Sequence, residues 1–121
     1  MLGNLDQEVP TVRQLRGVLL EYRARNDVGK VHALYAGRTA IGRSTDCDLV
    51  LDDHEASKQH AIIYVRADDA SFMDISSNGS VVDGRRLHGG QATLQQGSTI
   101  VIGTRLYVFL YASERTLAGM K

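Results

Sequence analysis

The chain of 121 residues lacks the features that mark several specialised protein classes. It contains a single cysteine, so no internal disulfide can form, and no apolar run approaches the roughly 18 residues that a membrane span needs. The 14 basic residues equal the 14 acidic ones, which argues against a dedicated nucleic-acid-binding domain. The acidic, polar start of the chain resembles neither a secretory signal nor a transit peptide. We therefore expect a cytoplasmic protein without a membrane or nucleic-acid partner.

The residues that are present suit one compact domain. The sequence is 43% hydrophobic and 23% charged, close to the average of soluble globular proteins. It has 12 glycines and one proline, and the glycines recur at turn-like places between short apolar segments. Many short segments separated by turn signals are typical of an all-β sandwich or barrel.

The apolar pattern predicts a series of short strands. Residues 17–23 fit a strand or, by a helical stripe of apolar residues, a helix, and the glycine at position 17 favours the strand. Gly103 and Thr104 predict a type II′ hairpin, and Asp68-Asp69 a second hairpin turn. Further strands are expected at 31–35, 39–41, 48–51, 59–66, 70–75, 80–82, 99–102 and 105–111.

The two ends of the chain differ from this pattern. Residues 1–14 contain the only proline and have no clear period, so we interpret them as a flexible N-terminal tail. The domain is expected to span residues 15–112. Residues 113–121 are expected to form a C-terminal tail or linker that could begin a helix.

Three polar clusters lie in loops next to expected strands, and the core does not explain them. They are Gly42-Arg43-Ser44, the segment from Ser57 to His60, and the segment from Asp74 to Gly79. Their side chains are mainly hydrogen-bond donors: a guanidinium, an ammonium, hydroxyls and an amide. Donors suit an anion with many acceptor oxygens, and loops at the end of a sandwich commonly carry binding residues. The clusters therefore predict a phosphate-binding site.

In this order and spacing the three clusters, followed by Val-x-Gly at 82–84, resemble the forkhead-associated (FHA) domain family. The resemblance covers about residues 17–111. It implies an all-β, FHA-type β-sandwich of about eleven strands that binds phosphothreonine peptides through loops at one end. Two positions depart from the family pattern: Lys58 stands where Arg is common, and Ser77 where Thr is common. The segment from Asp74 to Asn78 is also one residue shorter than usual.

The resemblance assigns a role to each residue that matches the motif. The residues implied to bind phosphothreonine are Arg43, Ser57, Lys58, Ser77 and Asn78. The residues implied to shape the loops without touching the ligand are Gly42, His60 and Gly79.

The function implied by the resemblance is that of a non-enzymatic module for phosphothreonine peptides in protein-kinase-linked signalling. It would be the input or regulatory domain of a larger, possibly bacterial, protein, downstream of a Ser/Thr kinase. Its partner would be a phosphothreonine-containing protein or its own N-terminal tail, with Thr11 as the candidate phosphoacceptor. The alternative is a phosphate-independent interaction scaffold on the same sandwich.

The sequence favours this interpretation over a catalytic or metal site. Ser57, His60 and Asp74 could be assembled into a hydrolase triad, but there is no Gly-x-Ser-x-Gly motif. The four histidines have no metal-ligand spacing with one another or with Cys47. We therefore expect no enzyme activity, no metal and no cofactor.

Overall fold

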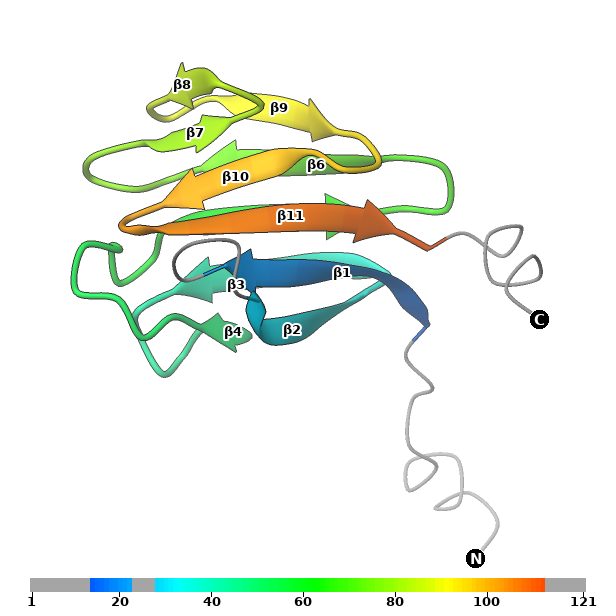
Figure 1. Cartoon of the computed structure of the whole chain (residues 1–121), viewed down its shortest axis with the longest axis horizontal. Coiled ribbons are helices and arrows are strands. Elements are labelled where there is room, and N and C mark those ends of the chain that lie inside the picture. The colour runs from blue at the N-terminus through cyan, green and yellow to red at the C-terminus, as the bar shows by residue number, and fades with distance from the viewer. Residues whose placement is uncertain (1–13, 23–27, 113–121) are drawn as a thin grey trace, which may run out of the picture.

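The computed structural model describes residues 14–22 and 28–112, and within them the chain forms eleven strands and no helix (Figure 1). The strands are β1 (Leu15–Tyr22), β2 (Val28–Tyr35), β3 (Gly37–Gly42), β4 (Leu49–Val50), β5 (Ala61–Val65), β6 (Ala70–Asp74), β7 (Ser80–Val82), β8 (Arg85–Leu87), β9 (Gln91–Leu94), β10 (Thr99–Ile102) and β11 (Arg105–Tyr111). The expectation of an all-β fold with about eleven strands is confirmed. Apart from Gln14, the expected tails at 1–14 and 113–121 lie outside the described residues, as do the expected helix start and Thr11.

The strands form two sheets that pack face to face. One sheet has six strands in the order β2-β1-β11-β10-β7-β8, and the other has five in the order β4-β3-β5-β6-β9. Within the described chain, every strand pairing is antiparallel except that of β3 with β4, which is parallel. The core between the sheets includes fully buried Leu19, Ile63, Phe72, Ile100 and Phe109.

Alternating burial explains why the first segment is a strand and not a helix. Along β1, Leu19 and Glu21 are buried, while their neighbours are only half-buried. This period of two matches a strand with one face toward the core. Glu21 is 2% exposed and accepts hydrogen bonds from His32 Nε2 at 2.8 Å and Arg105 Nη1 at 3.1 Å, which compensates its buried charge.

The turns follow the sequence signals. Asp83 and Gly84 both have positive φ, 50° and 79°, as a type I′ hairpin requires, and they join β7 to β8. Gly103 has a positive φ of 59°, and Thr104 does not have a positive φ. The β10–β11 turn is therefore type II′, as predicted.

The loops that carry the three polar clusters lie at one end of the sandwich (Figure 1). They are the connections from β3 to β4, β4 to β5 and β6 to β7, and the β10–β11 turn lies beside them. The opposite end holds the start of β1 and the end of β11, where Ala112 N–H donates to Arg16 O and Ala36 N–H to Gln14 O. The polar loops therefore lie at the end of the sandwich opposite Gln14 and Ala112, where the described part of the chain begins and ends.

Candidate functional site

Backbone hydrogen bonds hold the first two loop clusters side by side. Arg43 N–H donates to Ser57 O at 3.0 Å, and Ser44 N–H donates to Lys58 O at 3.1 Å. Next to them, His60 N–H donates to Ile41 O at 2.9 Å, where the loop joins the sheet. The loop after β3 is thus paired to the loop before β5, and the Arg43 and Ser57 side chains start from adjacent backbone positions.

The guanidinium of Arg43 is fixed against the second loop. Its Nε donates to Ala56 O at 3.1 Å, although the residue as a whole is exposed. This bond uses Nε, so the two terminal amino groups can face an anion. A guanidinium that is already held through its Nε loses less rotamer freedom when it binds a phosphate.

The third cluster joins the other two through Ser57. Ser77 N–H donates to Ser57 Oγ at 3.0 Å, across 20 residues of sequence. Because the Ser57 hydroxyl accepts this bond, its own proton remains for an acceptor in the pocket. The loop after β6 is therefore positioned by the same side chain that the family resemblance assigns to phosphate binding.

The three loops surround an open pocket of about 450 Å³. All five residues expected to bind phosphothreonine line it: Arg43, Ser57, Lys58, Ser77 and Asn78. Ser57 is half-buried and the other four are exposed. The remaining lining residues are His54, Glu55, Ala56 and Gln59. The pocket offers donors at its rim and two cationic side chains, an arrangement that suits a phosphate.

His60 lies beneath this pocket and does not face a ligand. It is 1% exposed, its Nδ1 accepts from Ser57 N–H at 2.9 Å, and its Nε2 lies 3.0 Å from Ser80 Oγ. Ser80 Oγ in turn donates to Asp74 Oδ1 at 2.6 Å, so it must accept from Nε2–H, and the ring is the neutral Nε2–H tautomer. Burial lowers the pKa of His60, and the Asp74 carboxylate only partly opposes this shift.

The same contacts are incompatible with a Ser-His-Asp triad. Ser57 meets His60 through its backbone N–H, while its hydroxyl accepts from Ser77. A nucleophile would instead need its hydroxyl bonded to the ring. The histidine acts on the position of the Ser57 backbone.

Asp74 is the buried anchor of the third loop. It is 1% exposed, and it accepts from Ser76 Oγ at 2.7 Å, Ser80 Oγ at 2.6 Å and Gly89 N–H at 2.8 Å. Burial alone would raise the pKa of this carboxyl, but the hydrogen bonds outweigh it and the pKa is lowered. The anion is therefore the form on which the loop is built.

The two glycines expected to shape the loops lie where a side chain would not fit. A Cβ on Gly42 would lie 2.1 Å from Lys58 O and 2.9 Å from Cys47 Sγ, so the two loops could not pair as they do. Gly79 has φ 95°, and its N–H donates to Ser76 Oγ at 2.8 Å.

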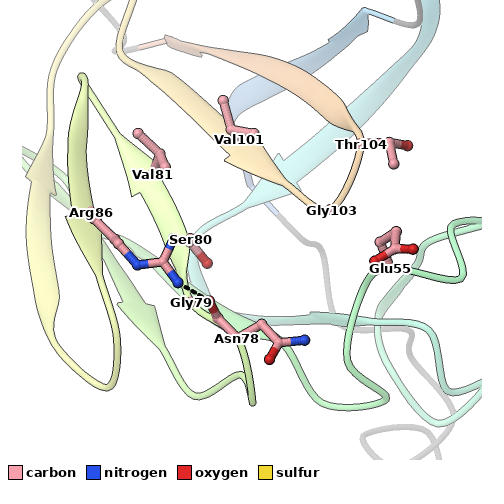
Figure 2. Close-up of a pocket in the computed structure, with 9 residues that line it drawn as sticks. All are labelled: Glu55, Asn78, Gly79, Ser80, Val81, Arg86, Val101, Gly103 and Thr104. Atoms are coloured by element: carbon pink, nitrogen blue, oxygen red, sulfur yellow. Dashed lines mark hydrogen bonds between the residues drawn. The ribbon is translucent and has the colours of Figure 1, made fainter.

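A second pocket of about 380 Å³ adjoins the first and shares Glu55 and Asn78 with it (Figure 2). Its floor includes Val81 and Val101, a cross-strand pair of β7 and β10. Arg86 of β8 lies on one side and donates from Nη2 to Asn78 O at 2.6 Å; Glu55 and Thr104 lie on the other side. The second pocket thus continues the first over the outer face of the six-stranded sheet.

Sequence reasoning missed several residues that build these pockets. No motif assigns a role to Ser76 or Ser80, and from the sequence the Arg85-Arg86 pair fits either a contact to a phosphate backbone or the solvated charge of a hairpin tip. Asp53 stands outside these motifs, just after the expected strand at 48–51, although it bridges two loops in the structure. Each acts through partners distant in the sequence, which a local pattern cannot show. Within residues 14–22 and 28–112 there is no group of three metal-ligating side chains and no helix that could cross a membrane.

Comparison with known proteins agrees with the architecture and the loops. The family model of the FHA domain matches residues 39–103, a span that contains all three polar clusters. The chain belongs to the FHA domain family. Domains of this family are binding modules, and solved members share the two-sheet fold.

The similar proteins differ in length and activity. The chain is 32% identical over 94 residues to the DNA damage response protein kinase DUN1 of Saccharomyces cerevisiae, covering 70% of this chain and 18% of the kinase. It is 33% identical over 97 residues to the oxoglutarate dehydrogenase inhibitor of Corynebacterium jeikeium, covering 79% of this chain and 66% of the inhibitor. EmbR of Mycobacterium tuberculosis, solved in complex with a low-affinity phosphopeptide, is 30% identical with a TM-score of 0.71. The match covers 93% of this chain and 29% of EmbR. The chain therefore spans only part of each of these proteins, and the match to the kinase covers its FHA part alone.

Proposed function

We propose that this chain is a phosphothreonine-peptide-binding module. The observation that carries the proposal is the convergence of three loops, distant in the sequence, on one pocket lined by Arg43, Ser57, Lys58, Ser77 and Asn78. The membership of the FHA family and the phosphopeptide bound to EmbR support it. The module captures its ligand and does not turn it over.

The chemistry of capture follows from the donors. A phosphothreonine carries about −1.5 to −2 charges at neutral pH and three acceptor oxygens. Arg43 supplies the fork, Ser57 a hydroxyl proton and Lys58 a mobile cation, while Ser77 contacts the phosphate or its threonine. Each charge-assisted hydrogen bond contributes about 1.5–3 kcal/mol before the ordering of the peptide is subtracted. A few such bonds give affinities around the micromolar range, near −8 kcal/mol.

The remaining contacts extend from the phosphate to the peptide. Asn78 stands between the two pockets, so its amide can hold the peptide backbone as the chain leaves the phosphothreonine. The second pocket then takes a neighbouring side chain. In the cell, a Ser/Thr kinase supplies the phosphorylated partner, and the module is the input domain of a signalling protein.

The test compares a phosphothreonine peptide with its unmodified twin. Isothermal titration should give micromolar binding of the phosphorylated peptide and no measurable binding of the twin. Equal binding of both would instead support the phosphate-independent scaffold. Hydrolysis of either peptide would contradict the assignment as a binding module.

A finer proposal concerns the N-terminal tail, with Thr11 as the phosphoacceptor. Gln14 lies at the end of the sandwich opposite the pocket, and β1 of eight residues separates the two ends by about 26 Å. Three residues from Gln14 to Thr11 extend only about 11 Å, so phosphorylated Thr11 must bind a second copy of the chain. Phosphorylation at Thr11 should therefore produce dimers or longer assemblies in light-scattering measurements, and substitution of Arg43 should abolish them. A monomer at all concentrations would contradict self-recognition.

A further inference from the structure

One carboxylate outside the three clusters bridges two loops of the ligand end. Asp53, between β4 and β5, is only 8% exposed. Its Oδ2 accepts from Thr104 N–H at 2.9 Å and from Thr104 Oγ1 at 3.1 Å, and its Oδ1 accepts from Glu55 N–H at 3.0 Å. A single side chain thus holds the loop before β5 to the β10–β11 turn, 51 residues further along the chain.

The bridge is tight and charged. A Cβ on Gly103 would lie 2.5 Å from Asp53 Oδ2, so the turn approaches the carboxylate as closely as a glycine permits. Burial would raise the pKa of Asp53, but the Thr104 and Glu55 hydrogen bonds, together with nearby Arg105, outweigh burial and lower it. The carboxylate is therefore an anion that accepts three hydrogen bonds under ordinary conditions.

The two residues that Asp53 holds line the second pocket on one side. Glu55 and Thr104 border it on the side opposite Arg86, and the apolar pair of Val81 and Val101 lies between these two sides (Figure 2). Both belong to loops, which would otherwise shift relative to the sheet. Their backbone N–H groups end on the same carboxylate, so their separation is fixed by the width of one side chain.

We propose that Asp53 is a positioning residue that sets the shape of the second pocket and thereby the selectivity for peptide residues that follow the phosphothreonine. The inference rests on the proposed function, since it concerns the pocket next to the phosphate. A pocket whose walls are fixed before binding rejects side chains that do not fit, while mobile walls adapt to many. Asp53 lines neither pocket, so it acts only through Glu55 and Thr104.

The experiment separates selectivity from phosphate binding. Each residue after the phosphothreonine is varied in turn among an apolar, an acidic, a basic and a small side chain, and the affinities are measured for the wild type and Asp53→Asn. In Asp53→Asn the amide group would face an N–H donor, so one of the two loops is released. The control is Asp52→Asn, which changes the net charge equally at the adjacent exposed residue. N-acetyl-phosphothreonine amide, which fills only the first pocket, reports phosphate binding alone.

The ratio of the highest to the lowest affinity among the side chains tested at one peptide position measures the selectivity there. At the position where the wild type is most selective, we expect Asp53→Asn to reduce this ratio at least fivefold. The affinity for N-acetyl-phosphothreonine amide should stay within twofold, and Asp52→Asn should match the wild type in both. An unchanged spread, or an equal loss for the minimal ligand and the long peptides, overturns the inference. A wild type that binds no phosphopeptide overturns the proposed function and this inference together, whereas selective wild-type binding that Asp53→Asn preserves overturns the inference alone.

A second pair of variants applies if Asp53→Asn does not fold. Thr104 is exposed, so Thr104→Ser and Thr104→Ala should both fold, and both remove the methyl group. Only Thr104→Ser keeps the hydroxyl that donates to Asp53. Thr104→Ser should retain more of the selectivity than Thr104→Ala, and equal selectivity of the two overturns the inference.

Discussion

Replacement of His60 tests how the buried layer beneath the pocket positions the loop that carries Ser57. The ring is 1% exposed and makes two hydrogen bonds, one to Ser57 N–H and one to Ser80 Oγ. His60→Ala removes both hydrogen bonds and leaves a cavity. A lost buried ring and an orphaned N–H together cost about 2–4 kcal/mol of unfolding free energy. For a domain of this size, that lowers the midpoint of thermal unfolding by about 10–20 °C.

Two amide replacements separate the two hydrogen bonds of the ring. In His60→Asn the amide oxygen takes the place of Nδ1, so it still accepts from Ser57 N–H. In His60→Gln the amide reaches the place of Nε2, so it keeps the contact with Ser80 but leaves Ser57 N–H without its acceptor. Both variants should be less stable than the wild type, by about 1–2 kcal/mol.

The phosphopeptide affinities of the two variants should differ although their stabilities are similar. The Asn variant should bind within about threefold of the wild type, because Ser57 N–H keeps its acceptor; a tenfold change corresponds to about 1.4 kcal/mol. The Gln variant, with Ser57 released, should bind about tenfold more weakly. Thermal unfolding and isothermal titration of the same samples measure both quantities. Equal affinities of the Asn and Gln variants would refute the claim that the ring positions Ser57.

Three further predictions test the site and its frame. Arg43→Ala should weaken phosphopeptide binding at least about 30-fold, because charge-assisted bonds of about 1.5–3 kcal/mol are lost, and a loss below about threefold in titration would contradict its role. Gly42→Ala should lower the unfolding free energy by about 1–3 kcal/mol because its Cβ would overlap a backbone carbonyl. The control Gly90→Ala, whose Cβ would lie 3.8 Å from Leu87 Cδ2, should not lower the unfolding free energy by this mechanism. Equal effects of the two substitutions in chemical denaturation would refute the steric argument. Because the pKa of buried neutral His60 is lowered, its contribution to stability is complete above about pH 6.5 and falls below it, by at most about 1.4 kcal/mol per pH unit. The lowered pKa of Asp74 adds a second loss of stability below about pH 4. In denaturation curves across pH, His60→Asn should remove only the loss that begins below about pH 6.5.

Most strands could be predicted from the sequence, and the two short edge strands β8 and β9 could not. The hairpins of β5 with β6 and of β10 with β11 combine runs rich in β-branched and aromatic residues with clear turn residues, and both were predicted. β8 consists of two exposed arginines and a half-buried leucine, and β9 has a single buried residue, Leu94. β8 therefore lacks the alternation that a half-buried strand shows, and β9 shows it over only four residues, which is too short to stand out from the surrounding loops.

The candidate site divides in the same way. Arg43, Ser57 and Ser77 stand in short motifs, and the structure brings them to one pocket. Asp53 has no such motif, because its main partner, Thr104, is 51 residues away and is brought near only by the packing of the two sheets.

A buried charge shows the same limit. The strand that contains Glu21 could be predicted, but its burial depends on His32 and Arg105, which are 11 and 84 residues away. Local patterns therefore predict which residues line the pocket. The residues that hold those side chains in place follow from tertiary pairing.

The central claim is that three loops form one phosphate-binding pocket, and an NMR titration tests it most directly. A uniformly labelled chain is titrated with a phosphothreonine peptide and, separately, with its unmodified twin. The account predicts large amide shifts at Arg43, Ser57, Ser77 and Asn78 with the phosphorylated peptide, and none at Tyr111 on the opposite end of the sandwich. The twin should leave all of these signals unchanged. Shifts centred away from the pocket, or the same shifts with both peptides, would contradict the account.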